Sequence, residues 1–123
     1  MDFEILYPSC NLDTITDGRG GIFTWFPKEP IVEYNMLYFK PGKSRGFHYH
    51  PEFVEYMLVV DGQGTMVVKK DDEEKIIHLS KGVSTRTAPF IYHTIYAITE
   101  LTLVAMLTKK WDDCDNPVIR EEL

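Results

Sequence analysis

The chain has 123 residues, enough for one domain with a buried core and short for two, so we expect a single domain over residues 1–123. Its 19 acidic and 13 basic residues give a formal net charge of -6, which disfavours nonspecific nucleic-acid binding, because phosphate recognition depends on clustered cations. No apolar run approaches the length of a membrane span, so small-molecule chemistry is the leading class of function.

Short runs rich in β-branched and aromatic residues recur along the chain, separated by Gly, Pro and Asp. In chain order, the predicted strands are 21–26, 32–40, 47–50, 54–60, 65–69, 75–79, 84–87, 91–98 and 101–107. Asp61-Gly62 predicts a tight hairpin turn, and the mixed-charge segment 69–75 predicts a solvated hairpin tip. The pattern indicates an all-β fold, and so many short strands favour a closed antiparallel barrel without exposed edges. Only the segment 112–123 is expected to include a helical turn, within the limits set by Pro117.

Cysteine usage and the first residues bear on the compartment. Cys10 and Cys114 lie near opposite ends of the sequence and have neither metal-knuckle nor redox-pair spacing, so we expect free thiols. The start of the sequence lacks the basic segment and long apolar core of an export signal. We therefore expect a cytoplasmic protein that is not bound to a membrane.

The chemistry-bearing residues concentrate in and after the predicted strand 47–50. His48 and His50 are two positions apart, so their side chains share one face of the strand, and Glu55 follows one short bend later. His93 supplies a third imidazole from far along the chain. These four side chains are a ligand set for a divalent ion such as iron, manganese, nickel or zinc, and the same groups suit proton transfer. His78 lies in a short alternating run and is expected on a strand surface.

The spacing of His48, His50, Glu55 and Gly62 resembles the first motif of the cupin superfamily. Gly82, Pro89 and His93 resemble its second motif, although Pro89 is shifted by one position and Ile91 stands where the general pattern has glycine. The resemblance implies a double-stranded β-helix, also called a jelly-roll barrel, with a small-ligand cavity in its mouth.

A narrower resemblance is to the deoxysugar branch of the cupins. It rests on four segments, 17–20, 44–50, 89–93 and 111–120. This branch contains the rhamnose-pathway 3,5-epimerases and the 3,4-ketoisomerases, which act on nucleotide-linked 4-keto-6-deoxyhexoses. The likeness implies a homodimer, for which we expect contacts through 22–26 and 32–39. Those sugar enzymes generally work without a metal, whereas three histidines with a glutamate are typical of metal-holding cupins, so both alternatives stay open.

We assign candidate roles on this basis. His48 and His50 are the predicted proton-transfer groups, with Tyr38 supporting them. Arg45 is predicted to hold a diphosphate through its guanidinium fork, with weaker substrate contacts from Tyr92 and Arg86. The segment 17–20 would form a turn, from which Arg19 could reach the substrate of a neighbouring subunit. Salt bridges for the arginines and plain packing for the tyrosines are the structural alternatives.

Three functions are compatible with these residues. The first is a sugar isomerase or epimerase that transfers protons by histidine on a nucleotide-linked keto-deoxysugar. The second is a metal-dependent enzyme, such as a dioxygenase, lyase or isomerase, with His48, His50, Glu55 and His93 as ligands. The third is a module that binds a small ligand without turnover, which normally requires an output domain or a partner protein. Metal analysis separates the first two.

Overall fold

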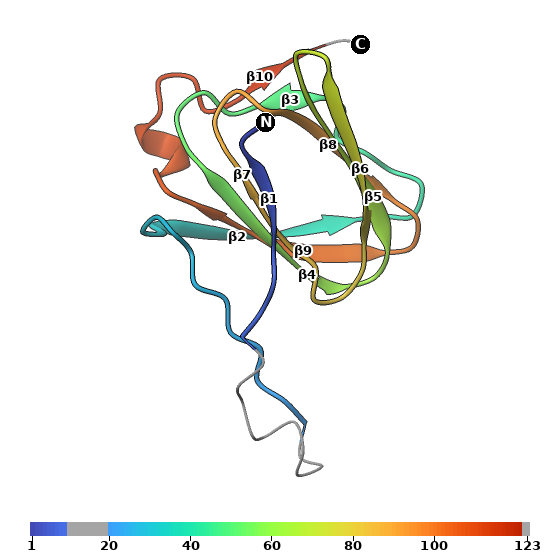
Figure 1. The fold of residues 1–123 in the computed structure, drawn as a ribbon. Coiled ribbons are helices and arrows are strands. Elements are labelled where there is room, and N and C mark those ends of the chain that lie inside the picture. The colour runs from blue at the N-terminus through green and yellow to red at the C-terminus, as the bar shows by residue number, and fades with distance from the viewer. Residues whose placement is uncertain (10–19, 122–123) are drawn as a thin grey trace.

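The computed structural model describes residues 1–9 and 20–121, which form two five-stranded antiparallel sheets facing each other (Figure 1). In spatial order, the first sheet contains β1 (Phe3–Leu6), β7 (Ser84–Thr87), β4 (Glu55–Asp61), β9 (Leu101–Leu107) and β2 (Glu33–Phe39). The second contains β10 (Ile119–Arg120), β3 (His48–Tyr49), β8 (Tyr92–Ala97), β5 (Gly64–Lys70) and β6 (Glu73–Leu79). The predicted all-β barrel is confirmed.

Strict alternation of side chains places the core between the sheets. On β9, Leu101, Leu103, Ala105 and Leu107 are buried, whereas the residues between them are half-buried. Leu101, Leu103 and Ala105 form one cluster with inward side chains of β1, β2, β4, β5, β6 and β8, since residues two apart share a face. Burying one aliphatic side chain of this size stabilises the fold by about 1.5–3 kcal/mol. On strands such as β9, the apolar alternation therefore determines which residues face inward.

The turn at Asp61-Gly62 differs from the prediction. Gly62 has the expected positive φ of 90°, but β4 and β5 belong to different sheets, so this segment crosses between sheets and is not a hairpin turn. A Cβ atom on Gly62 would lie 1.9 Å from the carbonyl oxygen of Glu100, so glycine is required there for space as well as conformation. By contrast, the hairpin tip predicted over 69–75 is confirmed, since β5 and β6 pair along their full length.

The N-terminal part of the chain also differs. The strand predicted over 21–26 is wrong, since this segment forms only a single bridge between Ser9 and Thr24 and extends away from the barrel (Figure 1). Instead, the shorter run Phe3–Leu6 forms β1 and pairs with β7. Phe3 is buried there, while Ile22 and Phe23 of the apolar run remain more than half exposed. Residues 17–19 and Cys10 lie outside the described residues.

The C-terminal segment contains a short helical turn, as the sequence indicated. It also contains a strand that the sequence did not indicate. A 3-10 turn forms at Trp111–Asp113, and the chain then reaches β10 beside β3. Cys114 is a free thiol in this segment. No helix of the described chain has the length and apolar character needed to cross a membrane.

Candidate active site

Three histidines from separate places in the sequence meet between the two sheets. His48 of β3 lies directly opposite His93 of β8 in the strand register, and His50 follows β3 by one residue. The ring centroids are 4.4 Å apart for His48 and His93, 5.1 Å for His48 and His50, and 5.2 Å for His50 and His93. One nitrogen of each ring lies within 4.8 Å of the corresponding nitrogens of the other two. The structure thus brings together the imidazoles that the spacing indicated.

Each of these rings is oriented by a backbone carbonyl. The Nδ1 atoms of His48, His50 and His93 lie 3.1, 2.9 and 2.9 Å from the carbonyl oxygens of Gly46, Pro117 and Ile91. Since a carbonyl oxygen only accepts, each Nδ1 must carry the hydrogen. In the neutral ring, Nε2 is then a lone-pair acceptor. Metal-binding and base-acting histidines are commonly fixed in this way.

Glu55 completes the cluster from β4. Its carboxylate oxygens lie 3.6 Å from Nε2 of His50 and 3.4 Å from Nε2 of His93. All three side chains are buried, and among residues 1–9 and 20–121 neither Nε2 atom has a hydrogen-bond partner. The carboxylate oxygens and the Nε2 atoms are all hydrogen-bond acceptors. Burying them side by side costs free energy unless a proton or a cation lies between them. The donor set therefore fits either an added proton or a bound cation.

The protonation states follow from burial and from the neighbouring charges. Burial lowers the pKa of His48 to about 4, helped by the charge on His93 and opposed by the bond to the Gly46 carbonyl. Burial likewise lowers the pKa of His50. For Glu55, burial alone would raise the pKa, but the contact with His93 and the electrostatic interaction with the three imidazoles outweigh this effect, so the pKa is lowered. At neutral pH, His48 and His50 are thus neutral bases and Glu55 is ionised.

A cavity of about 100 Å³ opens beside this cluster. His48, His50 and Glu55 line it, and a smaller recess reaches inward from His48 and Glu55 to His93. The remaining lining residues come from β2, the segment before β3, β9 and the C-terminal segment: Asn35, Leu37, Arg45, Ala105, Leu107, Trp111, Val118 and Arg120. His48 borders both spaces, so it is the imidazole best placed to meet a ligand.

Arg45 lies at this cavity, as the substrate-binding prediction requires. It is exposed, its guanidinium carbon lies 5.2 Å from the centre of the Phe39 ring, and it lines both the cavity and the inner recess. Among the residues that the structure describes, no carboxylate forms an ion pair with Arg45. The structural salt bridge considered as its alternative role is therefore not formed with the described chain.

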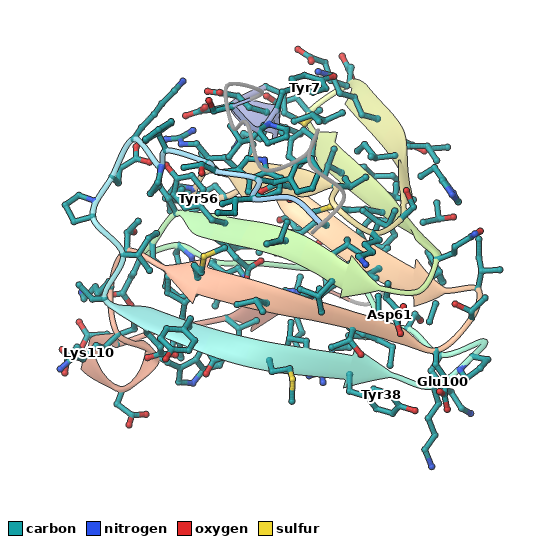
Figure 2. The ribbon with its side chains drawn as sticks, turned by 90° about the horizontal axis from the view of Figure 1, so that it is seen from below. Tyr7, Tyr38, Tyr56, Asp61, Glu100 and Lys110 are labelled. Carbon is teal, nitrogen blue, oxygen red and sulfur yellow. The ribbon has the colours of Figure 1, made fainter. Side chains whose placement is uncertain are left out.

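Tyr38 does not reach the cavity, because its neighbour Leu37 occupies the inward position on β2. The Tyr38 ring is 48% exposed and lies near Glu100 at one end of the strand (Figure 2). A hydrogen bond with Glu100 raises the pKa of the Tyr38 phenol, which makes proton donation harder. The predicted supporting role of Tyr38 in this subunit's proton transfer is therefore wrong.

Tyr92 also points away from the cavity, since the adjacent His93 points inward. Its hydroxyl donates to Glu121 at 2.8 Å, and this bond raises the pKa of Tyr92 to about 12. The side chain lies on the outer surface with Lys69 and Asp71. The prediction that Tyr92 contacts substrate in this cavity is therefore wrong.

Arg86 is buried on the outer face of the first sheet, beside Tyr56 and not beside Glu55. Its guanidinium donates to Glu29 at 2.8 and 3.0 Å and to Asp2 at 2.8 Å. These carboxylates saturate its charge, so the predicted phosphate contact from Arg86 is wrong. The alternation of strand 84–87 alone left its face undecided, because every residue of β7 is buried.

Seven lining residues were not singled out as ligand contacts from the sequence, among them Leu37, Ala105 and Leu107 of the predicted strands. Asn35 could have been found, since it shares a strand face with Leu37 two positions later. Trp111, Val118 and Arg120 could not, because they reach the cavity only through the way the C-terminal segment folds back. No periodic pattern in a segment with a 3-10 turn and a two-residue strand indicates this path.

Solved structures share the fold over nearly the whole chain. A 3,4-ketoisomerase from Helicobacter canadensis matches 98% of this chain and 92% of its own, with a TM-score of 0.83 and 20% identity. A mutant of the 3,4-ketoisomerase QdtA from Thermoanaerobacterium thermosaccharolyticum, in complex with TDP-4-keto-6-deoxyglucose, matches 97% of this chain and 87% of its own, with a TM-score of 0.77 and 19% identity. The capsular polysaccharide assembling protein CapF from Staphylococcus aureus matches 96% of this chain but 34% of its own, with a TM-score of 0.67 and 21% identity. At these identities, the likeness establishes the fold.

The barrel with three histidines gathered between its sheets is the fold that the cupin-like sequence motifs predicted. No curated protein is detectably similar in sequence. The family model described as the polysaccharide biosynthesis C-terminal domain matches residues 15–115, and the chain belongs to this family.

Proposed function

We propose that the protein is a sugar isomerase or epimerase that acts on a nucleotide-linked keto-deoxysugar by histidine proton transfer. The observation that carries this proposal is His48, a neutral imidazole whose Nδ1 hydrogen is held by the Gly46 carbonyl and whose ring lines the cavity. The shared fold of sugar ketoisomerases and membership in a polysaccharide biosynthesis family support the substrate class. A cytoplasmic location stays a prediction.

The chemistry requires one base and a stabilised oxyanion. A proton on the carbon beside a ketone is acidic enough for an imidazole, so Nε2 of His48 takes it while the electron pair moves onto the carbonyl oxygen. Returning a proton to the former carbonyl carbon, while the neighbouring hydroxyl passes its own proton to the former carbonyl oxygen, moves the ketone by one position. Returning it to the original carbon from the opposite face inverts that centre. His50 is the second proton-transfer group and, once it carries a proton, stabilises the oxyanion, whereas Arg45 at the cavity would hold the diphosphate.

Exchange with solvent tests this proposal. In deuterated water, the wild-type protein should place deuterium beside the ketone of TDP-4-keto-6-deoxyglucose, as followed by NMR. The His48→Asn variant should lose about 10²–10⁴-fold of this rate, the usual contribution of a general base. His78→Asn is the matched control, since His78 is exposed on β6. Undiminished exchange in His48→Asn would refute the role of His48.

A metal-dependent enzyme using the same cavity is the second candidate function. It is favoured by the two buried Nε2 atoms without partners beside an ionised carboxylate. The residues that would hold a divalent ion are His48, His50, His93 and Glu55. When bound, such an ion acts as a Lewis acid that polarises a substrate carbonyl.

Metal analysis decides between the two candidates. Near-stoichiometric iron, manganese, nickel or zinc in protein purified without chelator, lost in His50→Ala and kept in His78→Ala, would support the metal-dependent enzyme. Metal-free protein that still catalyses exchange would support the metal-independent isomerase.

We also infer a homodimer formed through the outer face of the first sheet. Tyr34 and Met36 of β2 are 79% and 76% exposed there, next to Val104 and Met106 of β9. These four side chains lie on the outer face of the first sheet, whose strands β4, β9 and β2 lie side by side in Figure 2, and such a face suits the same face of a second copy. Light scattering should report a dimer that Met36→Lys weakens. Ile76→Lys on β6, where Ile76 is 69% exposed, is the control. A monomeric wild type would contradict this inference.

A further inference from the structure

The C-terminal strap, defined as residues 111–121, closes one side of the active-site cavity. The Pro117 carbonyl accepts from Nδ1 of His50, and the Glu121 amide donates to the Phe47 carbonyl at 3.1 Å. Between these contacts, β10 pairs with β3 so that Arg120 lies directly opposite His48. Residues directly opposite in antiparallel strands point to the same face, so Arg120 joins His48 in lining the cavity.

Arg120 and Arg45 thus reach one small cavity from different segments of the chain. Within the described residues, neither guanidinium has a carboxylate partner. Arg86 provides the contrast, because Asp2 and Glu29 saturate it on the outer face. In a chain with a net charge of -6, two unpaired guanidiniums at one opening are left with hydrogen-bond donors for an anion from outside.

We propose that Arg120, together with Arg45, forms an anion clamp that holds the phosphate groups of the substrate. The substrate class rests on the proposed function, and the assignment of Arg120 and the strap to the substrate site goes beyond it. A guanidinium presents two parallel N–H donors to phosphate oxygens, which fixes orientation as well as charge. Because Arg120 lies opposite His48, a phosphate held there keeps the attached sugar beside the base.

Calorimetric titration tests the clamp, with TDP as the probe and thymidine as its phosphate-free match. Arg120→Gln should raise the Kd for TDP at least 10-fold and leave that for thymidine unchanged, because only the phosphates meet the guanidinium. Arg120→Lys, which keeps the charge but loses the fork, should fall between wild type and Arg120→Gln. Lys75→Gln is the control for net charge, since Lys75 is exposed on β6. Circular dichroism and thermal unfolding verify that each variant is folded.

The outcomes separate the clamp from the isomerase. Unchanged TDP affinity in Arg120→Gln overturns the clamp, as does a wild type that binds TDP no better than thymidine, even where exchange on the keto sugar is observed. Conversely, an Arg120-dependent TDP affinity in a protein without any exchange keeps the clamp and refutes the isomerase. In an active protein, Arg120→Gln should raise KM more than it lowers kcat, whereas His48→Asn lowers kcat.

Discussion

Two clusters of buried charge lie back to back on the same pair of strands. Glu55 and Tyr56 are consecutive on β4 and face Thr87 and Arg86 of β7, so one position points into the cavity and the next points to the outer face. On the outer face, two carboxylates satisfy the guanidinium of Arg86. In the cavity, the Nε2 atoms near Glu55 have no hydrogen-bond partner within the part of the chain that the structure describes. Both clusters are therefore buried and charged. The cluster in the cavity differs in that its hydrogen-bond acceptors lack donors, which is the feature typical of a functional site.

The largest effect on stability should come from a substitution in the outer cluster around Arg86, whose hydrogen bonds are satisfied. Arg86→Ala removes the partner of Glu29 and Asp2 and a buried side chain, so the free energy of unfolding should fall by about 3 kcal/mol, the lower end for a broken buried pair because both partners are partly exposed. Urea denaturation measures this. TDP affinity of the folded variant should be unchanged. A stable Arg86→Ala protein that has lost TDP binding would restore the original phosphate-contact prediction.

A smaller effect is expected from acid. The Arg86 guanidinium and the Tyr56 hydroxyl, which also bonds to Glu29, lower the pKa of Glu29 to about 2 from an ordinary 4.5. Since the folded pKa is depressed, this contribution to stability is complete above pH 4.5 and is lost as the pH falls toward 2. Urea midpoints measured across this range should fall more steeply for wild type than for Glu29→Gln. If the urea midpoints of the two proteins fell with pH at the same rate, ionisation of Glu29 would not contribute to stability.

The smallest effect on stability should come from the cavity. In Glu55→Gln, an amide that can donate to a free Nε2 replaces a buried carboxylate, so the free energy of unfolding of metal-free protein should rise or change by less than about 1 kcal/mol. The rate of deuterium exchange into the keto sugar should nevertheless fall, because the net charge of the active-site cluster has changed. A loss of several kcal/mol would mean that Glu55 serves the fold as Arg86 does.

The fold and the centre of the site could be predicted from local patterns. Period-two alternation identified most strands, and the spacing of His48, His50 and Glu55 identified the cluster. The assignment of β4 and β5 to different sheets could not be predicted. The sequence Asp61-Gly62 is equally compatible with a hairpin turn within one sheet and with a crossover between two sheets. The faces of Tyr38 and Arg86 depended on strand register, and a shift of one residue reverses every side chain. The face of Tyr92 could have been predicted, because Tyr92 is adjacent to His93 and must point the opposite way. The position of Arg120 at the cavity could not be predicted either, because tertiary contacts and not a local pattern make the C-terminal segment fold back against β3.

The carbonyl of Pro117 has a consequence for how the protein is handled in the laboratory. It accepts the ring hydrogen of His50, yet it belongs to a segment whose described residues contribute only the two-residue strand β10 to the sheets. A version of the chain ending at Asn116 would keep the main strands and the apolar interior, but its His50 ring would be free to turn over and exchange tautomers. Such a truncated protein could look native by circular dichroism and still be inert.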